Sequence, residues 1–379
     1  MPPQKRLFEL DALRGLSLFG IVLMNILVFS MPYEEAYLPD IVHGINEGLL
    51  RIVTLVVISS FYPIFSFLFG YGLAIMYENI QYRGLRYYPI IYRRLACLLI
   101  IGLIHGCFIF SGDILFGYAF TGMLAVLLIK KKTKTLIKAA TILFVLKIIL
   151  IVIPFSVFSW NTGRNDTNNF SGMSLGQLID VKQNGNYFDL LKININETVM
   201  SVLDVMTTSA YLEFLPYILC GIIAQKLNLI TVLRNNNNQK RTTFWGMLCI
   251  VIGYTLKVPF AIDYSNNAFQ YISAMVGGPI VAAGYILIFL RLCQVSKVRK
   301  VVHLFEYPGK LSLTVYLSQS IIFTLIYMGL GLYNKLELYQ SYLIVLIVYS
   351  LQVCASYYYL KKFKQGPVEW AWRKITYLK

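Results

Sequence analysis

Long apolar stretches alternate with short polar connections along the whole chain. A helix of about 20 apolar residues is long enough to cross the hydrocarbon core of a bilayer. The alternation of a barrel strand is absent, and in lipid the helix is the other conformation that satisfies its own backbone hydrogen bonds. The pattern therefore predicts an all-α, polytopic membrane protein with about ten transmembrane helices. These helices are expected at 14–31, 50–76, 93–110, 114–129, 137–158, 205–225, 244–262, 270–292, 311–330 and 341–360.

Lys and Arg residues gather in alternate connections, and the connections between them are acidic or neutral. Basic connections stay on the cytoplasmic side of a membrane, so we expect a multi-pass protein of the cell (plasma) membrane with both termini cytoplasmic. The basic clusters are Arg83, Arg86, Arg93 and Arg94; Lys130, Lys131, Lys132 and Lys134; Lys226, Arg234, Lys240 and Arg241; Arg291, Lys297, Arg299 and Lys300; and Lys361, Lys362, Lys364, Arg373 and Lys374. The acidic residues are Glu34, Glu35, Asp40 and Glu47 in the first connection, and Asp166, Asp180 and Asp189 in the fifth.

Composition agrees with this assignment. Hydrophobic residues make up 57% of the 379 residues and charged residues only 14%, which excludes an ordinary soluble domain. The net charge of +16 would suit a nucleic-acid-binding protein, but its confinement to alternate connections explains it as membrane topology. We therefore expect membrane lipid, and no nucleic acid, as a partner. A homodimer is left open.

The spans divide into two halves of five. We expect an N-terminal half at 1–158, an extracytoplasmic loop at 159–203, and a C-terminal half with a cytoplasmic tail at 204–379. Within the loop, LGQLIDV and YFDLLKI are candidates for interfacial helices. No internal repeat and no paired interrupted helices are visible, although a transporter built from inverted repeats would show them.

A His and an Asp flank a predicted turn in the apolar segment LIIGLIHGCFIFSGDILFGYAF. Ionisable side chains inside a membrane are costly unless they have partners or a function. His105 lies about 9 Å below the Ser111-Gly112 turn by helical rise, and Asp113 begins the next helix. A hairpin would bring both within hydrogen-bond distance, as a general base oriented by a carboxylate. The structural alternatives are a helix N-cap for Asp113 and a packing role for His105.

The first helix carries a polar stripe. Asp11 and Arg14 are three residues apart and can pair on one helical face. Asn25, eleven residues after Arg14, returns to within about 20° of that face and lies about 16 Å further along. The stripe is predicted either to contact an anionic or acylated substrate, or to reach the interface and a neighbouring helix.

Other polar residues lie within the predicted spans. Glu213 and Lys147 each cost about 2.5–3.5 kcal/mol at the bilayer centre on insertion scales. We expect Glu213 to pair with Lys147 or with Lys257, as a structural ion pair or as a proton or substrate relay. The inner half of the segment GKLSLTVYLSQS is polar and is expected to form the wall of a cavity, with Ser312, Thr314, Ser318, Gln319 and Ser320.

Two glycine- or tryptophan-containing motifs predict packing. Gly70 and Gly72 in FLFGYG permit close approach of helices, or alternatively leave a groove for an acyl chain. In the tail segment GPVEWAWRK, Trp370 and Trp372 are typical of a docked interfacial helix.

Five segments together resemble the bacterial YeiB-like membrane proteins, whose C-terminal half is catalogued as a domain of unknown function (418). They are LDALRGLSLFGIVLMN, FSFLFGYG, IHGCFIFSGDILFGYAFTG, GKLSLTVYLSQS and GPVEWAWR. The N-terminal half of that family is similar to transmembrane acyltransferases of the heparan glucosaminide N-acetyltransferase type and to sugar O-acyltransferases. The latter have an Arg in the first helix and a His eleven residues later. Arg14 matches, whereas Asn25 occupies the later position.

The resemblance implies an acyltransferase that uses acyl-CoA, with acetyl-CoA as the expected donor, as co-substrate and a hydroxyl or amine acceptor at the outer face. His105 would then be the base, Asp113 its orienting carboxylate, and Asn25 a donor to the thioester carbonyl. Arg14, Arg93 and Arg94 would bind the CoA phosphates. The residues expected to contact substrate are Asp11, Arg14, Glu213 and Gln319.

No metal site is expected, because none of the six cysteines forms a Cys-x-x-Cys motif. Two other functions stay open. The first is a transporter or lipid-handling protein that does no covalent chemistry, in which the buried polar residues would line a pathway. The second is a structural or signalling component of the membrane.

Overall fold

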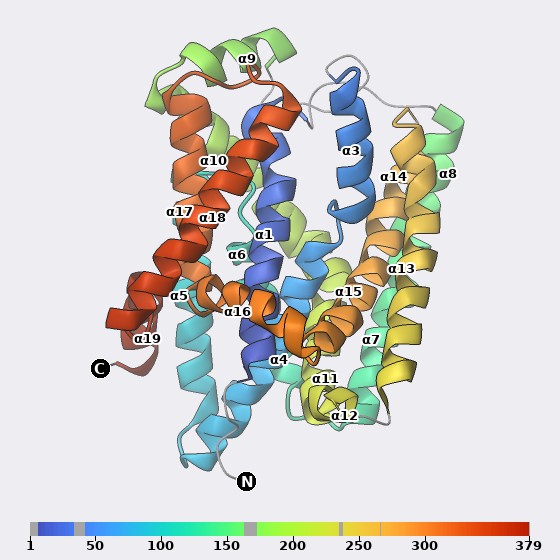
Figure 1. Cartoon of the computed structure of the whole chain (residues 1–379), viewed down its shortest axis with the longest axis vertical. Helices are drawn as coiled ribbons and strands as arrows, with labels where there is room; N and C mark the ends of the chain where they lie inside the picture. Colours follow the sequence, from blue (N-terminus) through green and yellow to red (C-terminus); the bar gives the residue numbers. More distant parts are fainter. Residues whose placement is uncertain (1–6, 34–41, 163–172, 235–237, 266, 379) are drawn as a thin grey trace.

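The structure, a computed structural model, describes residues 7–33, 42–162, 173–234, 238–265 and 267–378. Within these ranges every regular element is a helix. Nine helical segments of this part of the chain are long and apolar enough to cross a membrane, and one apolar helix, α6 (Leu115–Leu128), is shorter. Each of the ten predicted stretches contains helix. The prediction of an all-α polytopic membrane protein is therefore confirmed (Figure 1).

Among the described residues, the first half of the chain contains eight helical elements and the remainder contains fourteen. The first half contains α1 (Phe8–Ser30), α3 (Ile45–Val56), α4 (Phe61–Tyr82), α5 (Tyr87–Phe108), α6, α7 (Thr133–Lys147), the π-helical segment η1 (Ile148–Val152) and α8 (Ile153–Thr162). The remainder contains α9 (Leu175–Asn184), α10 (Tyr187–Asp204), η2 (Val205–Phe214), α11 (Leu215–Lys226), α12 (Leu229–Arg234), α13 (Gln239–Ile262), α14 (Asn267–Ile272), η4 (Ser273–Gly277), α15 (Gly278–Leu292), α16 (Ser296–Lys310), α17 (Ser312–Thr324), η5 (Leu325–Gly329), α18 (Leu338–Lys362) and α19 (Pro367–Tyr377).

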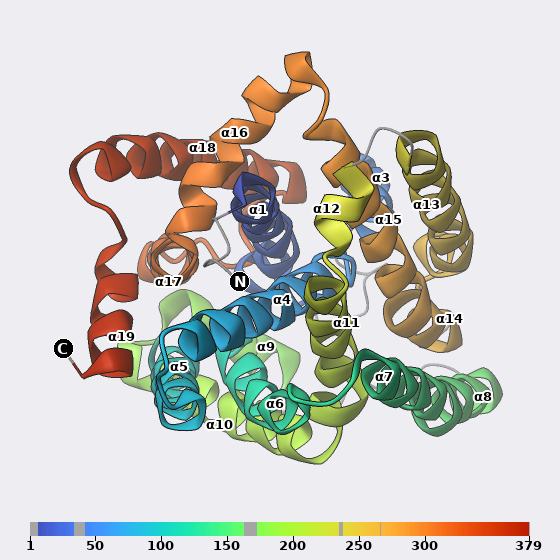
Figure 2. The same ribbon diagram turned by 90° about the horizontal axis from the view of Figure 1, so that it is seen from below.

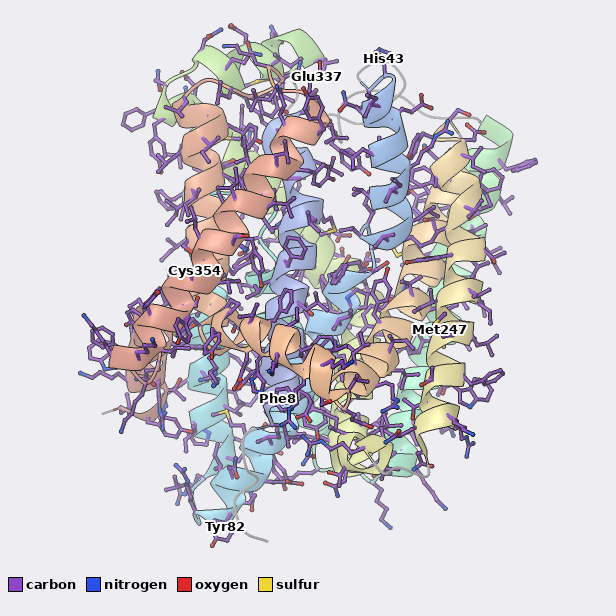
Figure 3. The ribbon with its side chains drawn as sticks, viewed as in Figure 1. Phe8, His43, Tyr82, Met247, Glu337 and Cys354 are labelled. Atoms are coloured by element: carbon purple, nitrogen blue, oxygen red, sulfur yellow. The ribbon has the colours of Figure 1, made fainter. Side chains whose placement is uncertain are left out.

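The alternating connections lie at opposite ends of the bundle. His43, Glu337 and α9 lie at the upper end in Figures 1 and 3, and Phe8, Tyr82 and α12 lie toward the lower end. We call the lower end, which carries the Arg83–Arg86 connection and α12, the basic end. The acidic residues Glu34, Glu35, Asp40 and Asp166 lie outside the described residues.

Helix α1 lies in the middle of the bundle, between α4 and the helices α16, α17 and α18 (Figure 2). Glycines allow close backbone contacts both at α1 and between α4 and α11. A Cβ atom added to Gly309 of α16 would lie 1.7 Å from the Asp11 carbonyl oxygen, and one added to Gly70 of α4 would lie 2.0 Å from the Ile218 carbonyl oxygen of α11. The packing role predicted for Gly70 is therefore confirmed, because no larger residue fits at this backbone contact.

The expected span at 50–76 is interrupted, which the sequence did not predict. The helix stops at Val56, passes through Ser59 with φ +59°, and resumes at Phe61. Lys257 of α13 donates to the Ile58 carbonyl (2.7 Å) and to the Ser60 hydroxyl (2.9 Å). A break within apolar surroundings exposes backbone groups that need partners, and the lysine supplies them.

The polar segment before the sixth span is largely helical where it is described. Capping boxes start α9 at Ser174 and α10 at Asn186, and in each case a side chain satisfies the first backbone N–H groups. The helix α10 then continues through η2 and α11 as one helical segment of 40 residues. YFDLLKI is thus the first part of this continuous segment and is not a separate helix.

Candidate active site

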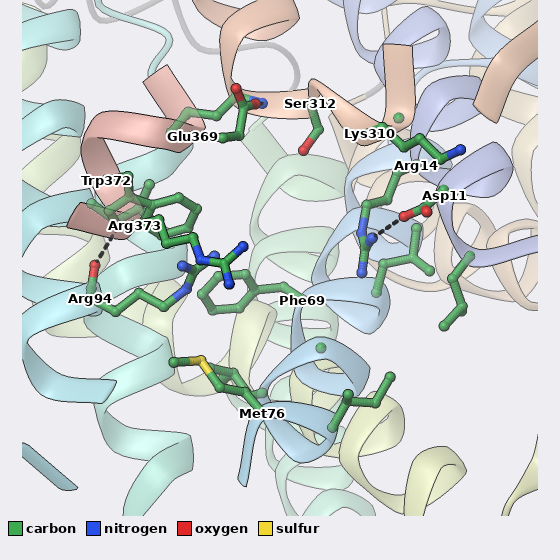
Figure 4. Close-up of a pocket in the computed structure, with 18 of the residues that line it drawn as sticks. Asp11, Arg14, Phe69, Met76, Arg94, Lys310, Ser312, Glu369, Trp372 and Arg373 are labelled. Carbon is green, nitrogen blue, oxygen red and sulfur yellow. Dashed lines mark hydrogen bonds and ion pairs between the residues drawn. The ribbon is translucent and has the colours of Figure 1, made fainter. Parts of the chain in front are cut away.

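A cavity of about 540 Å³ lies among α1, α4, α5, α6, α16, α17 and α19 and reaches Arg83 at the basic end. Its interior is mostly apolar, with Phe65, Phe69 and Met76 of α4 in its wall. Gly72 leaves space beside it, because a Cβ there would meet only the Arg14 guanidinium, at 3.6 Å. The cavity therefore combines an apolar interior with a polar end (Figure 4).

The lining carries more positive than negative charge. The basic residues of the lining are Arg14, Arg83, Arg94, Lys310 and Arg373, and the acidic ones are Asp11 and Glu369. Asp11 accepts from Arg14 at 2.7 Å. Glu369 accepts from the backbone N–H groups of Leu313 and Thr314, at 2.8 and 3.0 Å, at the start of α17. Both carboxylates are thus engaged within the protein. Lys310 is paired with Glu306, which lies outside the lining, and the remaining excess of positive charge favours an anionic ligand.

Arg94 is held between the cavity and the tail helix. Its guanidinium carbon lies 3.5 Å from the ring centroid of Trp372, and its carbonyl accepts from the Trp372 Nε1–H at 2.8 Å (Figure 4). The charges of Arg14 and Arg373 both act on this guanidinium. Three like charges at one cavity repel each other, so an anion between them would relieve that repulsion.

The cavity ends near the His105–Asp113 pair. Ile114 and Tyr316 form part of its inner wall, and the Tyr316 ring centroid lies 5.2 Å from that of His105. The Tyr316 hydroxyl accepts from the Ile114 backbone N–H at 3.4 Å. The pair is therefore separated from the cavity by the tyrosine side chain.

His105 and Asp113 are bonded, as the hairpin predicted. Nδ1 and Oδ2 are 2.7 Å apart, and the side chains are 1% and 3% exposed. The other carboxylate oxygen accepts from the Phe116 backbone N–H at 2.9 Å, so Asp113 also caps α6. An ionised carboxylate only accepts, and therefore Nδ1–H donates to Asp113. Nε2 is buried without a hydrogen-bond partner among the described residues.

Other predicted site residues do not reach the cavity. On α1 the lining covers Leu7, Leu10, Asp11 and Arg14 only, because it follows the first two turns of the helix and stops before Asn25. Arg93 is outside the lining, since adjacent helical residues point about 100° apart.

Gln319 also lies outside the lining, and it serves helix packing. It donates to Gln352 of α18 at 3.0 Å, and Gln352 donates to Ser318 at 2.9 Å. The part of the prediction that placed Gln319 in a cavity wall is wrong, because its amide faces α18. Ser312 of the same segment does line the cavity.

The expected ion pairs of Glu213 are also wrong. Glu213 accepts from the Tyr62 hydroxyl at 2.5 Å, and Lys147 donates to the Tyr217 hydroxyl at 2.7 Å. Lys257 is committed to the interrupted helix described above. Tyrosine hydroxyls of α4 and α11 therefore lie between the charged groups, and Glu213 is outside the cavity lining.

The sequence predicted docking of the tail but not its place in the cavity. Helix α19 packs against α5 and α17 and supplies Glu369, Trp372 and Arg373 to the lining. Their i, i+3 and i+4 spacing puts them on one helical face, which was the available signal. Among the described residues, no three His, Cys, Asp or Glu side chains form a group that could hold a metal ion.

Known proteins match nearly the whole chain. The family model "Protein of unknown function (DUF418)" matches residues 227–379. The uncharacterized protein YxaH of Bacillus subtilis (strain 168) is 30% identical, over 99% of this chain and 95% of that protein. The uncharacterized protein YeiB of Escherichia coli (strain K12) is 25% identical, over 98% and 96% of the two chains. No solved structure matches. The chain therefore belongs to the YeiB-like family of bacterial membrane proteins that carries DUF418.

Proposed function

We propose that this protein transfers an acyl group from an acyl-CoA bound in the cavity to a hydroxyl or amine acceptor, with His105 as the general base. One observation carries the proposal. A single cavity joins a cationic end, at the basic end of the bundle, to an apolar interior bounded by Tyr316. The Tyr316 ring lies 5.2 Å from the buried imidazole of His105, which Asp113 orients. The cavity volume of about 540 Å³ is within the range of small-molecule sites.

The donor would bind through charge at one end and apolar contact at the other. Arg14, Arg94 and Arg373 suit phosphate groups, because guanidinium groups form charge-assisted hydrogen bonds with them. The space beside Gly72 and the wall formed by Phe69 and Met76 suit the uncharged pantetheine arm and its thioester. The basic end, predicted to be cytoplasmic, is the side on which acyl-CoA is available.

The dyad would then carry the proton transfers. As the acceptor oxygen or nitrogen attacks the thioester carbonyl carbon, Nε2 of His105 takes its proton. The carbon–sulfur bond breaks, and the imidazolium returns the proton to the departing thiolate. Asp113 keeps the ring oriented through Nδ1–H and stabilises the imidazolium.

Two details refine the earlier hypothesis. Since Tyr316 separates His105 from the cavity, its side chain has to move when the donor binds. Asn25 lies outside the cavity lining, so no role in polarising the carbonyl is assigned to it.

The test uses the full-length chain in lipid nanodiscs with acetyl-CoA that carries a labelled acetyl group. Binding should be saturable, and release of the CoA thiol should increase with amino-sugar acceptors. His105→Gln should lower thiol release about 10²–10⁴-fold with little change in binding. The matched control is His303→Gln, because His303 also bonds a carboxylate, Glu306, at 2.8 Å but lies on α16.

Two results would contradict the proposal. Absence of saturable acetyl-CoA binding would exclude the donor. Equal thiol release by the wild type and His105→Gln would exclude His105 as the base.

A second candidate function is the movement of an amphipathic anion without covalent chemistry. The cavity supports it, because a cationic end joined to an apolar interior would suit such an anion with or without a covalent step. Transport would deliver the labelled acetyl group to the far side of a vesicle still attached to CoA, whereas transfer would separate the two.

A further inference from the structure

A smaller cavity of about 210 Å³ lies beside the first one at the basic end. The two cavities share Arg83, Gln365, Arg373 and Tyr377 in their linings, so they are contiguous. A cavity of this size is below the range of about 300–1,000 Å³ that holds a whole small-molecule ligand. It therefore suits one end of a ligand whose remainder lies in the first cavity.

Its lining is basic and aromatic. Arg83, Arg373 and Lys374 bring three positive charges, Trp370 and Tyr377 bring two aromatic rings, and no acidic residue belongs to the lining. Lys374 lies over the Trp370 ring, with Nζ 4.0 Å from its centroid. Phosphate groups bind such cations, and planar bases stack on such rings.

The tail helix presents these groups in an ordered way. Trp370, Arg373, Lys374 and Tyr377 are spaced i, i+3, i+4 and i+7, so they share one face of α19. The hydrogen bond from Trp372 to the Arg94 carbonyl and the bonds from the start of α17 to Glu369 fix the helix in place. The face is thus preorganised beside the end of α4, which contributes Arg83.

From these features we infer that the smaller cavity is a subsite for a nucleoside phosphate, the base and phosphate end of an elongated ligand. The inference deepens the proposed function, since it assigns the nucleotide end of the donor to α19 and Arg83. It does not depend on acyl transfer, because a nucleotide without an acyl group would bind in the same place.

The experiment measures binding of adenosine 3′,5′-bisphosphate to the full-length protein in nanodiscs of zwitterionic lipid. Saturable binding is expected. Arg83→Ala combined with Lys374→Ala should weaken it about 10–100-fold, as expected for the loss of charged hydrogen bonds. Lys361→Ala combined with Lys364→Ala removes the same charge from residues outside both linings and should change binding less than about twofold.

A second comparison tests the aromatic part. Wild-type protein should bind adenosine 3′,5′-bisphosphate at least about tenfold more tightly than inorganic pyrophosphate, because base stacking adds to phosphate binding. Trp370→Ala should reduce that ratio several-fold and leave pyrophosphate binding nearly unchanged.

The inference is overturned if the nucleotide shows no saturable binding, or if both double variants weaken binding equally. It is also overturned if nanodiscs with anionic lipid abolish nucleotide binding, since the cavity would then hold a lipid headgroup. Failure of the acetyl-CoA thiol-release assay with intact, Arg83- and Lys374-dependent nucleotide binding would reject the proposed function and leave the subsite standing.

Discussion

Two groups of cationic side chains differ in how their charges are balanced: the cavity arginines (Arg14, Arg94 and Arg373) and two buried lysines, which we call the sealed lysines (Lys147 and Lys257). Lys147 and Lys257 are buried, 1% and 0% exposed, and each donates to hydroxyl or carbonyl groups of neighbouring helices. Arg14, Arg94 and Arg373 stand around one cavity in which the basic residues outnumber the acidic ones. The two lysines have neutral acceptors within the fold. The cavity lining holds more basic than acidic side chains even though Arg14 is paired with Asp11, and this excess suits an anionic ligand. The comparison shows that a buried cation in a membrane bundle is not by itself a sign of a binding site.

The largest effect expected from this comparison is on folding stability at the sealed lysines. Lys257→Met leaves the Ile58 carbonyl and the Ser60 hydroxyl without their donor, which should lower the free energy of unfolding by about 2–5 kcal/mol. Thermal unfolding in nanodiscs measures the change. Lys240→Met, at an exposed position of the same helix, is the control and should change stability little. Equal melting temperatures for the two variants would show that Lys257 contributes no more to stability than an exposed lysine.

The next effect is on ligand binding at the cavity. Arg94→Ala should weaken acetyl-CoA binding about 10–100-fold, because a charged hydrogen-bond donor is lost. Isothermal titration calorimetry measures this affinity. In the comparison, Lys147→Met should leave the affinity unchanged, and a similar loss in both variants would mean that the arginines are not a specific site.

At Glu369, substitution is expected to have two smaller effects: a loss of folding stability and a gain in acetyl-CoA affinity. Glu369→Gln removes the charge of a carboxylate that caps α17 and lines the cavity, so stability should fall by about 1 kcal/mol. The cavity becomes more positive at the same time, and acetyl-CoA should bind a few-fold more tightly. Glu47→Gln, on the exposed pair with Arg51, is the control for both measurements. Weaker acetyl-CoA binding by Glu369→Gln would show that the carboxylate itself contacts the ligand.

The smallest effect is a pH dependence at α16. Burial alone would raise the pKa of Glu306, but hydrogen bonds from Lys310 and His303 lower it below its ordinary value of 4.5. A lowered pKa stabilises the fold above that value, and the contribution is lost as the pH falls through the folded-state pKa. As the pH falls below 4.5, the free energy of unfolding should therefore decrease more for the wild type than for Glu306→Gln, by about 1 kcal/mol or less. Thermal unfolding at a series of pH values measures this difference. Parallel curves would contradict this.

Several features followed from the sequence because they depend on neighbouring residues. Apolar length predicted the membrane helices, and charge alternation predicted which connections share an end of the bundle. The His105–Asp113 bond could also be predicted from the sequence, since the two residues are only eight positions apart and a tight turn lies between them. In each case the physical cause, burial in lipid or a short loop, acts along a continuous segment of chain.

The tertiary structure alone decided where the charged groups find partners. The cavity joins residues of α1, α4, α5, α6, α16, α17 and α19, and its first and last lining residues, Leu7 and Tyr377, lie near opposite ends of the chain. Lys257 meets the break before α4 across about 200 positions, and tyrosines stand where direct ion pairs were expected. Hydrophobic pattern fixes that a helix crosses the membrane, but not its rotation or its neighbours. One helical position turns a side chain by about 100°, so the partner of each charge is set only when the helices pack.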